Sequence, residues 1–413
     1  MTPDRARVVI IGSGIAGSSI AYHLTELGWN DVIVLDQGEL ISGTTSHPPG
    51  LVGQMRTSPA LIKLLMYSVS LYKDLPEYGE PGFSQVGSLR LASSKRRWQE
   101  SKELARLAKS AGLEAELISA AQAQKLFPLM SVKGVEGALF FPTDGSARAP
   151  LLAKALADGA RGRGARLYPQ TPVTDFEIKR GQITAIKTAQ GRIETEVAVV
   201  AAGIWSPRVG RLAGVSIPLV PMQHQWAKTE PLAQLHRSMP NLRDPDNRVY
   251  FRVDQQTLSM GGYETTPKTF RVESIPANDN PTVRPFDSPR FKSLLRGGIR
   301  RVPQLRAVKW IQQTNGLESF TPDGNFILGE APEVRGLWVA CGFCAHGVSG
   351  AGGVGKTMAE WIVSGQPSFD MRQMDIRRFG PEASSRRYVA ERAVKVYQKY
   401  YSIGALRRIR RAR

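Results

Sequence analysis

The sequence predicts a mixed α/β fold in which a dinucleotide-binding domain carries an inserted domain with a sheet of its own. The first forty residues read as strand, helix and strand, which is the usual start of a parallel sheet. Fully apolar strands of the buried type return at residues 197–203 and 337–343. Between them, residues 216–320 show mixed strand patterns. The first domain is therefore expected to be assembled from three separated segments.

Domain boundaries are placed where these patterns change. Residues 1–85, 145–215 and 320–365 are predicted to form the dinucleotide-binding domain, residues 86–144 and 216–319 the antiparallel-sheet substrate domain, and residues 366–413 a helical, basic C-terminal extension.

The individual elements follow from apolar spacing and from turn signals. VVIIG is a buried strand, SSIAYHLTELG has apolar residues at helical spacing and stops at Gly28, and DVIVLD is the next strand. Ser119 is a typical N-cap residue, and Gly112 stops the charged helix before it. In chain order we expect strand 8–12, helix 18–28, strand 31–36, helix 61–75, strand 88–92, helices 98–112, 118–130 and 151–164, a hairpin over 173–203 turning at Arg180-Gly181 and Gln190-Gly191, a polar loop over 276–289, strand 337–343 and helix 355–365.

Composition places the chain among globular proteins. It has 413 residues, of which 42% are hydrophobic and 22% charged, and no run of apolar residues is long enough to span a membrane. The start, MTPDRARVVIIG, passes directly from a short basic stretch into a strand without an apolar stretch and cleavage site, so secretion is not expected. The only two cysteines, Cys341 and Cys344, suit a reducing compartment, so we expect a cytoplasmic protein. Because Cys341 lies inside an apolar strand, the C-G-F-C pair is interpreted as core residues, and no metal site is expected.

The positive charge is concentrated at the C-terminus. The net charge is +19, and residues 386–413 contain ten Lys or Arg and one Glu. The final LRRIRRAR could contact phosphate or an anionic membrane, but a solvated arginine-rich tail is the simpler interpretation. No zinc-finger spacing, RNP-type motif or basic recognition helix accompanies it, so no nucleic acid partner is expected.

The motif with the most specific chemistry is G-x-G-x-x-G, formed by Gly12, Gly14 and Gly17 between a strand and a helix. Gly12 permits a tight turn, Gly14 lets the backbone approach a pyrophosphate, and Gly17 allows the helix to pack closely on the strand. Asp36 ends the next strand and can accept hydrogen bonds from a ribose. The pattern predicts a dinucleotide site at this helix N-terminus, and by itself it fits either FAD or NAD.

Other motifs resemble one family, the flavin-dependent amine oxidoreductases that include dimethylglycine oxidase, dimethylglycine dehydrogenase and sarcosine dehydrogenase. The resemblance runs from Val8 to about Tyr401 and is carried by GSGIAG, VLDQG, TTSHPPGL, FPTDG, VVAAGIW, PMQHQWAKT and ESFTPDGNFILGE. It implies a fold like that of D-amino-acid oxidase, with a Rossmann-like FAD-binding domain. It also implies oxidation of an N-methylated glycine, of the dimethylglycine or sarcosine type, by hydride transfer to the flavin, giving an iminium.

The resemblance further implies that His47 is bonded covalently to FAD. From the residues alone, a loop histidine that only packs or hydrogen-bonds is the simpler interpretation. The residues expected around the cofactor are Gly12, Gly14, Ile15, Ala16, Gly17, Asp36, Gln37, Thr44, Thr45, Ser46, His47, Leu51, Val173, Gly203, Ala351, Gly352, Gly353 and Val354.

The stretch GAGGVGKT, residues 350–357, matches the P-loop pattern of nucleotide triphosphatases. A true P-loop begins directly at the end of a buried strand, but here CAHGV separates it from the strand 337–343, and no suitable Walker-B acid follows. In the family that this chain resembles, the segment opens a helix whose N–H groups face the flavin. We therefore expect residues 351–354 to form a turn against the isoalloxazine.

His224 and Tyr263 are the candidate catalytic residues, because they match an active-site histidine and tyrosine of the dimethylglycine oxidase branch. Such groups can orient an amine and influence its proton. Without the resemblance, both read more simply as inward-facing polar residues of a sheet. His346, close to the flavin segment, stays a further candidate.

A substrate carboxylate needs a cation, for which Arg56 and Arg252 are candidates. The lysine that follows the H-G-F turn in the monomeric sarcosine oxidase branch is replaced here by Ser349, which leaves the mode of carboxylate binding open.

Several alternatives stay open. The same fold could oxidise another amino acid or a 2-hydroxy acid, and a non-catalytic, truncated relative could bind anionic partners through the basic tail. The electron acceptor could be oxygen or an electron-transfer protein. Long members of the family carry a folate-binding domain, for which this chain has no room. We expect either a separate folate-binding protein, hydrolysis of the iminium to formaldehyde, or a truncated chain.

Overall fold

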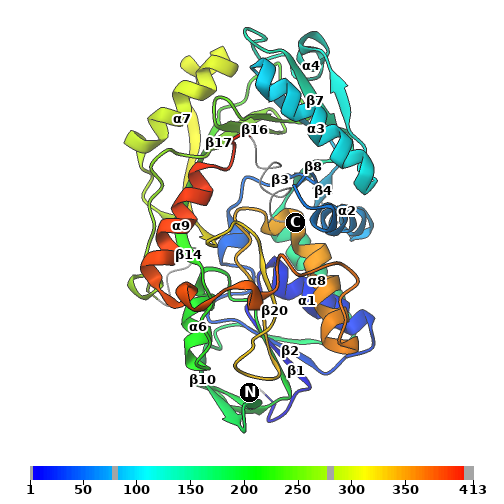
Figure 1. The fold of residues 1–413 in the computed structure, drawn as a ribbon, viewed down its shortest axis with the longest axis vertical. Coiled ribbons are helices and arrows are strands. Elements are labelled where there is room, and N and C mark those ends of the chain that lie inside the picture. The colour runs from blue at the N-terminus through cyan, green and yellow to red at the C-terminus, as the bar shows by residue number, and fades with distance from the viewer. Residues whose placement is uncertain (1–2, 77–81, 277–282, 404–413) are drawn as a thin grey trace.

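The first strand of the chain lies inside a six-stranded sheet in the computed structural model, which describes residues 3–76, 82–276 and 283–403 (Figure 1). Neighbouring strands are parallel except for the pair β20 and β21. In sheet order the strands are β20 (Ile327–Glu330), β21 (Leu337–Cys341), β13 (Val197–Val200), β1 (Val8–Ile11), β2 (Val32–Leu35) and β9 (Arg166–Tyr168). The mixed α/β fold predicted from the sequence is confirmed.

Both faces of this sheet are covered. Val8 and Ile10 of β1 belong to a core shared with helices, whereas Val9 and Ile11 belong to a second core on the opposite face. This alternation explains why the strand reads as one continuous apolar run. The helical layer consists of α1 (Ile15–Glu26), α2 (Pro59–Asp74), α5 (Ala149–Gly162) and α8 (Gly347–Ser364). The other layer is an antiparallel meander of β10 (Val173–Lys179), β11 (Gln182–Thr188) and β12 (Gly191–Glu194), beside α6 (Ser206–Leu212).

A nine-stranded sheet forms the second half of the molecule. Its strands are antiparallel to their neighbours except for β15 and β5, which pair in parallel. The order is β18 (Val283–Arg284), β19 (Trp310–Phe320), β14 (Val220–Thr229), β17 (Thr257–Gly262), β16 (Val249–Asp254), β15 (Asn241–Asp244), β5 (Ser88–Ala92), β7 (Gly137–Phe141) and β6 (Glu116–Ile118). A small sheet of β3 (Leu51–Val52), β8 (Gly145–Ala147) and β4 (Phe83–Ser84) lies between the two large sheets. The proposed domain boundaries stay a prediction.

Local capping signals placed most helices correctly. The α3 helix (Lys95–Ala111) ends on Gly112 at φ +83°, and α4 (Ala120–Leu126) begins with a capping box between Ser119 and Gln122. The α7 helix (Ser288–Arg301) was not predicted, and it begins inside the segment expected to be a loop. That segment also contains β18, while residues 277–282 lie outside the described part of the chain.

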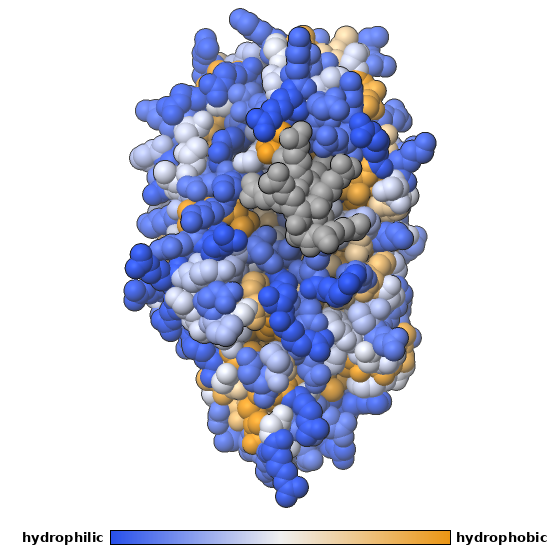
Figure 2. Space-filling view, viewed as in Figure 1, coloured by the Kyte–Doolittle hydropathy of each residue, from blue (hydrophilic) through white to orange (hydrophobic). Residues whose placement is uncertain are grey.

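The last described helix, α9 (Arg386–Gln398), lies along β14 (Figure 1). Residues 404–413, with all of LRRIRRAR, lie outside the described residues, so the roles considered for that tail stay untested. Figure 2 shows a mainly hydrophilic surface on the viewed face, with small apolar patches between charged side chains. In the part of the chain that the structure describes, no helix combines the length and apolar character needed to cross a bilayer.

Candidate functional site

The glycine turn after β1 has the geometry that its spacing predicts. Gly12 has φ +111°, and a Cβ on it would lie 2.5 Å from the Ala201 carbonyl oxygen. A Cβ on Gly17 would lie 1.9 Å from the Gly12 carbonyl oxygen, so α1 can approach the strand only with glycine there. Gly14 is the N-cap of α1 and faces the hydroxyl of Thr45.

Asp36 closes this turn at the carboxyl end of β2. Its Oδ2 accepts hydrogen bonds from the Ser13 backbone N–H at 2.8 Å and from the Ser13 hydroxyl at 2.6 Å. Its Oδ1 accepts from the Gly38 N–H at 3.0 Å, and the half-buried Gln37 follows it. The carboxylate is thus fixed beside the N-terminus of α1, where the fingerprint predicts a ribose.

Residues 44–47 connect this turn to the nine-stranded sheet. The Thr45 hydroxyl accepts the backbone N–H of Ile15 at 3.1 Å, at the start of α1. The Thr44 hydroxyl donates to the Leu317 carbonyl on β19 at 2.9 Å, and the Ser46 hydroxyl lies 3.2 Å from Nδ1 of His47. The predicted cofactor residues of this loop therefore lie between the glycine turn and β19.

The ring of His47 lies against Gly316 on β19, where a Cβ would be only 2.5 Å from Nε2. The Trp226 indole N–H donates to the His47 carbonyl at 3.0 Å and fixes the backbone. Nε2 is buried and has no hydrogen-bond partner among the described residues. Burial lowers the pKa of His47 to about 4, so the imidazole is neutral and nucleophilic at neutral pH. A buried nitrogen without a partner fits a site that is completed by another group.

Three other predicted cofactor residues lie at the ends of strands. Gly203 follows the carboxyl end of β13 with φ +54°, and a Cβ on it would meet open space. Val173 begins β10, and Leu51 begins β3, which follows the His47 loop. The carboxyl end of a parallel sheet is the general location for such ligands.

The expectation of a turn at Ala351, Gly352, Gly353 and Val354 is wrong, because these residues lie inside helix α8, whose N-cap is His346. The N–H of Gly352 donates to the Tyr72 hydroxyl at 3.1 Å and that of Gly353 to the Ser68 hydroxyl at 2.8 Å. A Cβ on Gly353 would lie 2.2 Å from the Leu64 carbonyl oxygen. The glycines thus allow α8 to pack on α2. The first turn of α8, at residues 347–349, is the part with N–H groups directed out of the helix.

The same helix excludes a P-loop. Lys356 pairs with Glu360 at 2.6 Å, and the buried Thr357 hydroxyl donates to the Gly353 carbonyl at 2.7 Å. A triphosphatase would direct these two side chains at phosphate and metal.

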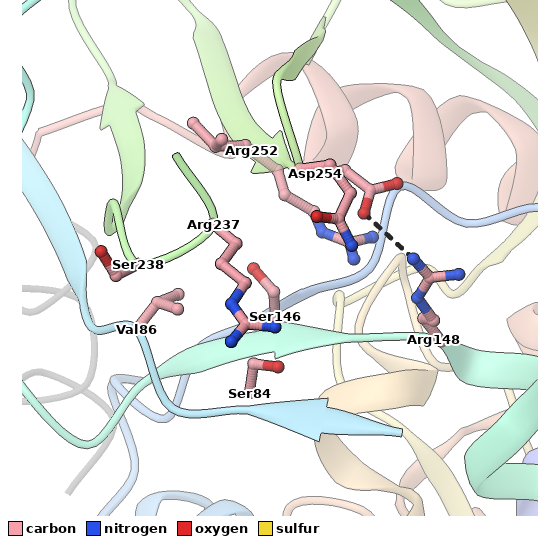
Figure 3. Close-up of a pocket in the computed structure, with 10 residues that line it drawn as sticks. Ser84, Val86, Ser146, Arg148, Arg237, Ser238, Arg252 and Asp254 are labelled. Atoms are coloured by element: carbon pink, nitrogen blue, oxygen red, sulfur yellow. Dashed lines mark hydrogen bonds and ion pairs between the residues drawn. The ribbon is translucent and has the colours of Figure 1, made fainter. Parts of the chain in front are cut away.

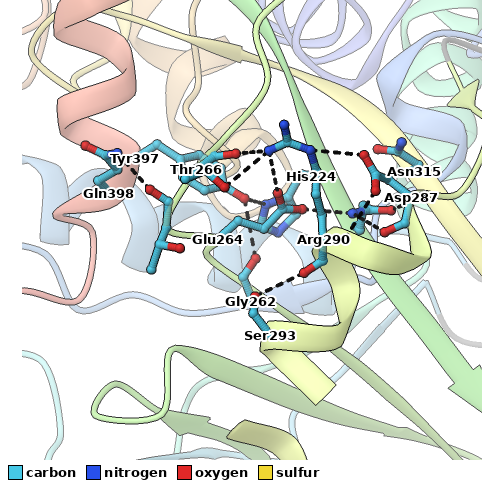
Figure 4. A network of polar contacts seen from close by, with 12 residues as sticks. His224, Gly262, Glu264, Thr266, Asp287, Arg290, Ser293, Asn315, Tyr397 and Gln398 are labelled. Carbon is cyan, nitrogen blue, oxygen red and sulfur yellow. Dashed lines mark hydrogen bonds and ion pairs between the residues drawn. The ribbon is translucent and has the colours of Figure 1, made fainter. Parts of the chain in front are cut away.

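His224 lies on β14, with both ring nitrogens next to tyrosine hydroxyls. Nδ1 is 3.0 Å from the hydroxyl of Tyr397 on α9, and Nε2 is 2.9 Å from the hydroxyl of Tyr250 on β16. Figure 4 shows His224 and Tyr397 within one network of polar contacts. Burial lowers the pKa of His224 to about 4. The ring of Tyr263 lies 5.1 Å from that of His224 and stacks on Tyr400 at 3.8 Å.

A cavity of about 40 Å³ brings His224, Tyr263 and His346 together with the loop that follows His47. Two charged residues that sequence reasoning missed face it, Arg243 on β15 and Glu318 on β19. Burial raises the pKa of Glu318 to about 7. The cavity is lined by Pro48, Pro49, Gly50, Leu51, His224, Arg243, Tyr250, Tyr263, Glu318, Ala345, His346 and Val348.

The two missed residues gave signals of different strength. Glu318 is a carboxylate within an otherwise buried strand stretch, GLESF, and this mismatch could have marked it. Arg243 stands in NLRDPD, a polar segment with no local signal.

Arg56 and Arg252, the cations proposed from the sequence, have different surroundings. Arg56 is half-buried and donates to the Met55 carbonyl at 2.7 Å, and its buried Nε and Nη2 have no partner among the described residues. Its charge interacts with Tyr400, Arg243 and Tyr263, so it lies close to the cavity without lining it. Arg252 is not among the lining residues and instead donates to the Pro49 carbonyl at 2.5 Å.

Ser349, Cys341 and Cys344 contact other parts of the protein and do not line the cavity. The Ser349 hydroxyl accepts the Gly53 N–H at 3.3 Å. Cys341 and Cys344 are free and buried, and burial raises the pKa of each to about 12, which confirms them as core residues. Within the described ranges, no three His, Cys, Asp or Glu side chains gather as metal ligands.

Comparison with protein-family models gives two matches. Residues 7–361 match a family described as FAD dependent oxidoreductase, and residues 364–413 match one described as FAD dependent oxidoreductase central domain.

Individual relatives are similar over nearly the whole chain. Human sarcosine dehydrogenase is 37% identical over 97% of this chain and 44% of its own length, and human dimethylglycine dehydrogenase is 35% identical over 91% and 45%. The mouse pyruvate dehydrogenase phosphatase regulatory subunit is 35% identical over 97% and 46%. The chain thus spans less than half the length of these relatives. Among solved structures, L-proline dehydrogenase from P. horikoshii superposes with a TM-score of 0.82 at 25% identity, covering 92% of this chain and 98% of that one.

Proposed function

The chain belongs to the family of FAD-dependent oxidoreductases, and on this premise we propose that it oxidises an N-methylated glycine of the dimethylglycine or sarcosine type. The named activities of its sarcosine and dimethylglycine dehydrogenase relatives support this substrate class. The chemistry would convert the amine to an iminium, with FAD bonded covalently through His47.

The observation that carries the proposal is a cavity with one cation and one carboxylate among aromatic rings. Arg243 matches the carboxylate of an amino acid, since a guanidinium can bind it through two parallel hydrogen bonds. Tyr250 and Tyr263 provide an apolar wall for N-methyl groups. The loop after His47 forms another wall, so a substrate here would lie beside the residue proposed to hold the flavin.

The residues present fit FAD. The turn at Gly12, Gly14 and Gly17 suits the pyrophosphate, and Asp36 suits the adenosine ribose. The buried Nε2 of His47 has no hydrogen-bond partner among the described residues, so it would be free to bond to the 8α-methyl carbon of the flavin. FAD, when bound, supplies the acceptor for the hydride that leaves the substrate C–H.

Glu318 is the group that takes the proton from the substrate ammonium. Both nitrogens of His224 are occupied by tyrosine hydroxyls, and the pKa of His346 is lowered well below its usual value, first by burial and then by Arg56 and Arg243. The pKa values of Tyr250 and Tyr263 are raised by burial. Among the described residues that line the cavity, only Glu318 has a pKa near 7. Transfer of the ammonium proton to its carboxylate frees the nitrogen lone pair, which forms the C=N bond as hydride leaves.

His224 serves as a fixed wall in this scheme. Its neutral ring is held between Tyr250 and Tyr397, and it orients Tyr263 across the cavity. Either water or a separate folate-binding protein would consume the iminium.

Anaerobic mixing with candidate substrates tests the proposal. Sarcosine and dimethylglycine are expected to bleach the flavin absorption band, whereas trimethylated betaine, which has no nitrogen lone pair, leaves it unchanged. Bleaching by another amino acid or a 2-hydroxy acid alone would contradict the N-methylglycine assignment. If none of these substrates bleached the flavin, the result would favour a regulatory role like the one named for the 35% identical phosphatase regulatory subunit.

A further inference from the structure

A second cavity, of about 460 Å³, is lined in part by Arg252 (Figure 3), which also contacts Pro49 in the loop after His47. It is formed where the small sheet of β3, β8 and β4 meets the connection between β16 and β17. Nothing in the proposed oxidation uses it. Its lining residues are Ser84, Val86, Ser146, Arg148, Arg237, Ser238, Arg252, Val253, Asp254 and Gln255.

The charge of this lining is strongly positive. Among the described lining residues, three arginines accompany one carboxylate, and that carboxylate, Asp254, pairs with Arg148 at 3.3 Å and with Lys228 at 3.1 Å. Figure 3 shows the Arg237 guanidinium directed between Ser84 and Ser146. No described acidic side chain pairs with Arg237.

Arg252 supplies an independent observation that points to a ligand. Its side chain is half-buried, and the Nε of its guanidinium is buried without a hydrogen-bond partner among the described residues. Burial lowers the pKa of Arg252, with Asp254 opposing the shift. A cation with a buried, unused donor is costly unless an anion completes its surroundings.

We propose that this cavity binds a small polyanion that carries two or more phosphate or carboxylate groups. Guanidinium groups bind both kinds of anion through paired hydrogen bonds, and the hydroxyl of Ser84 adds a further donor. The hydroxyls of Ser146 and Ser238 already contact Asn241 and His236. The volume is within the range of metabolite pockets and exceeds the needs of one inorganic ion.

The site is connected to the loop that carries His47. The Nη1 of Arg252 donates to the Pro49 carbonyl, and a Cβ on Gly50 would lie 2.5 Å from that same Nη1. The Ala147 N–H donates to the Gly50 carbonyl at 2.7 Å, and Ser146 pairs with Leu51 between β8 and β3. An anion that fixes Arg252 would therefore restrain the loop between the two cavities.

Calorimetric titration of the full chain with pyrophosphate and, separately, with citrate tests the site at constant ionic strength set by chloride. We expect at least one of the two anions to bind at a single site. The anion that binds more tightly shows whether the site prefers phosphate or carboxylate groups. Arg237→Gln should weaken that binding at least tenfold, because this exposed side chain supplies a charge without a described protein partner. Arg208→Gln, at an exposed position on α6, is the matched control and should leave affinity unchanged.

Absence of binding to either probe would overturn the proposal. So would equal affinity in the Arg237 and Arg208 variants, since that result would place the anion on the general positive surface. These readouts do not depend on turnover, so the site can fail while the proposed oxidation holds, or the reverse.

Discussion

At the scale of single residues, His47 shows how much of the site depends on contacts that are distant in sequence. Its ring occupies space that any side chain at residue 316 would fill, and its backbone is held by Trp226. The glycine fingerprint and Asp36 were predictable because their spacing is local. Arg243 and Glu318 were not, because β15 and β19, which carry them, are brought into one sheet only by folding, with β14, β17 and β16 between them.

Replacing His47 tests the proposed covalent bond. His47→Ala removes the nucleophilic nitrogen, so flavin should be released into the supernatant when the variant is precipitated with acid. The wild-type pellet should stay yellow under the same treatment. The absorption spectra of pellet and supernatant give the answer, and a colourless wild-type pellet would refute the bond.

Glu318 gives a prediction about pH and rate. A base must be ionised to accept a proton, so flavin reduction should accelerate as pH rises through about 7, the raised pKa of Glu318. Glu318→Gln should slow reduction roughly 100-fold and remove this step, as general bases typically contribute about 10²- to 10⁴-fold. Stopped-flow reduction from pH 5.5 to 9 measures both effects, and an unchanged profile in the variant would assign the base elsewhere.

Glu318 also predicts how the free energy of unfolding changes with pH. Because the folded-state pKa of about 7 exceeds the ordinary value of 4.5, the folded protein retains a proton that the unfolded chain loses between these values. Stability should therefore fall as pH rises across that window, by about 3 kcal/mol. Denaturant unfolding at pH 4.5 and pH 8 should show this loss in the wild type and in the exposed control Glu116→Gln, but not in Glu318→Gln.

At the scale of elements, helices with caps and turns at their ends were predicted, whereas α7 was missed. Its two internal glycines lower its intrinsic helix propensity. In the fold they are needed, because a Cβ on Gly297 would lie 2.5 Å from the Asn247 carbonyl and one on Gly298 would lie 2.2 Å from the Met260 sulfur. The turn expected at residues 351–354 was wrong for a related reason. In sequence, glycines that let two helices pack closely cannot be told apart from glycines that let a backbone approach phosphate.

Helix packing predicts a large difference between two glycine-to-alanine changes. Gly353→Ala in α8 places a methyl group 2.2 Å from the Leu64 carbonyl oxygen and should cost at least about 2 kcal/mol of unfolding free energy. Gly162→Ala, near the end of α5, meets no atom within 4 Å and should stabilise by about 0.5 kcal/mol. Urea unfolding measures both values, and equal effects would contradict the packing role.

At the scale of the whole molecule, the site is completed by the end of the described chain. Tyr397 on α9 reaches His224 on β14, and the rings of Tyr400 and Tyr263 stack. The arrangement of the six-stranded sheet was predictable in outline, because its four central strands, β21, β13, β1 and β2, are fully apolar. The docking of α9 was not, since its sequence shows a charged helix and no sign of where it packs.

Tyr397→Phe tests this long-range contact. Loss of the hydroxyl beside Nδ1 of His224 should slow flavin reduction about tenfold and cost about 1 kcal/mol of stability, the typical net worth of such a hydrogen bond. Tyr388→Phe on the same helix should change neither quantity. Equal rates for the two variants would mean that α9 only covers the site.

The order of strands in the six-stranded sheet also bears on biosynthesis. β1 leaves the ribosome well before β13, with which it pairs, and β13 in turn pairs with β21 near residue 340. Such distant pairing is slow to form, so the apolar amino-terminal strands remain unpaired on one side while much of the chain is still being translated. We expect nascent chains of this protein to require a chaperone that shields those strands until β13 and β21 have emerged.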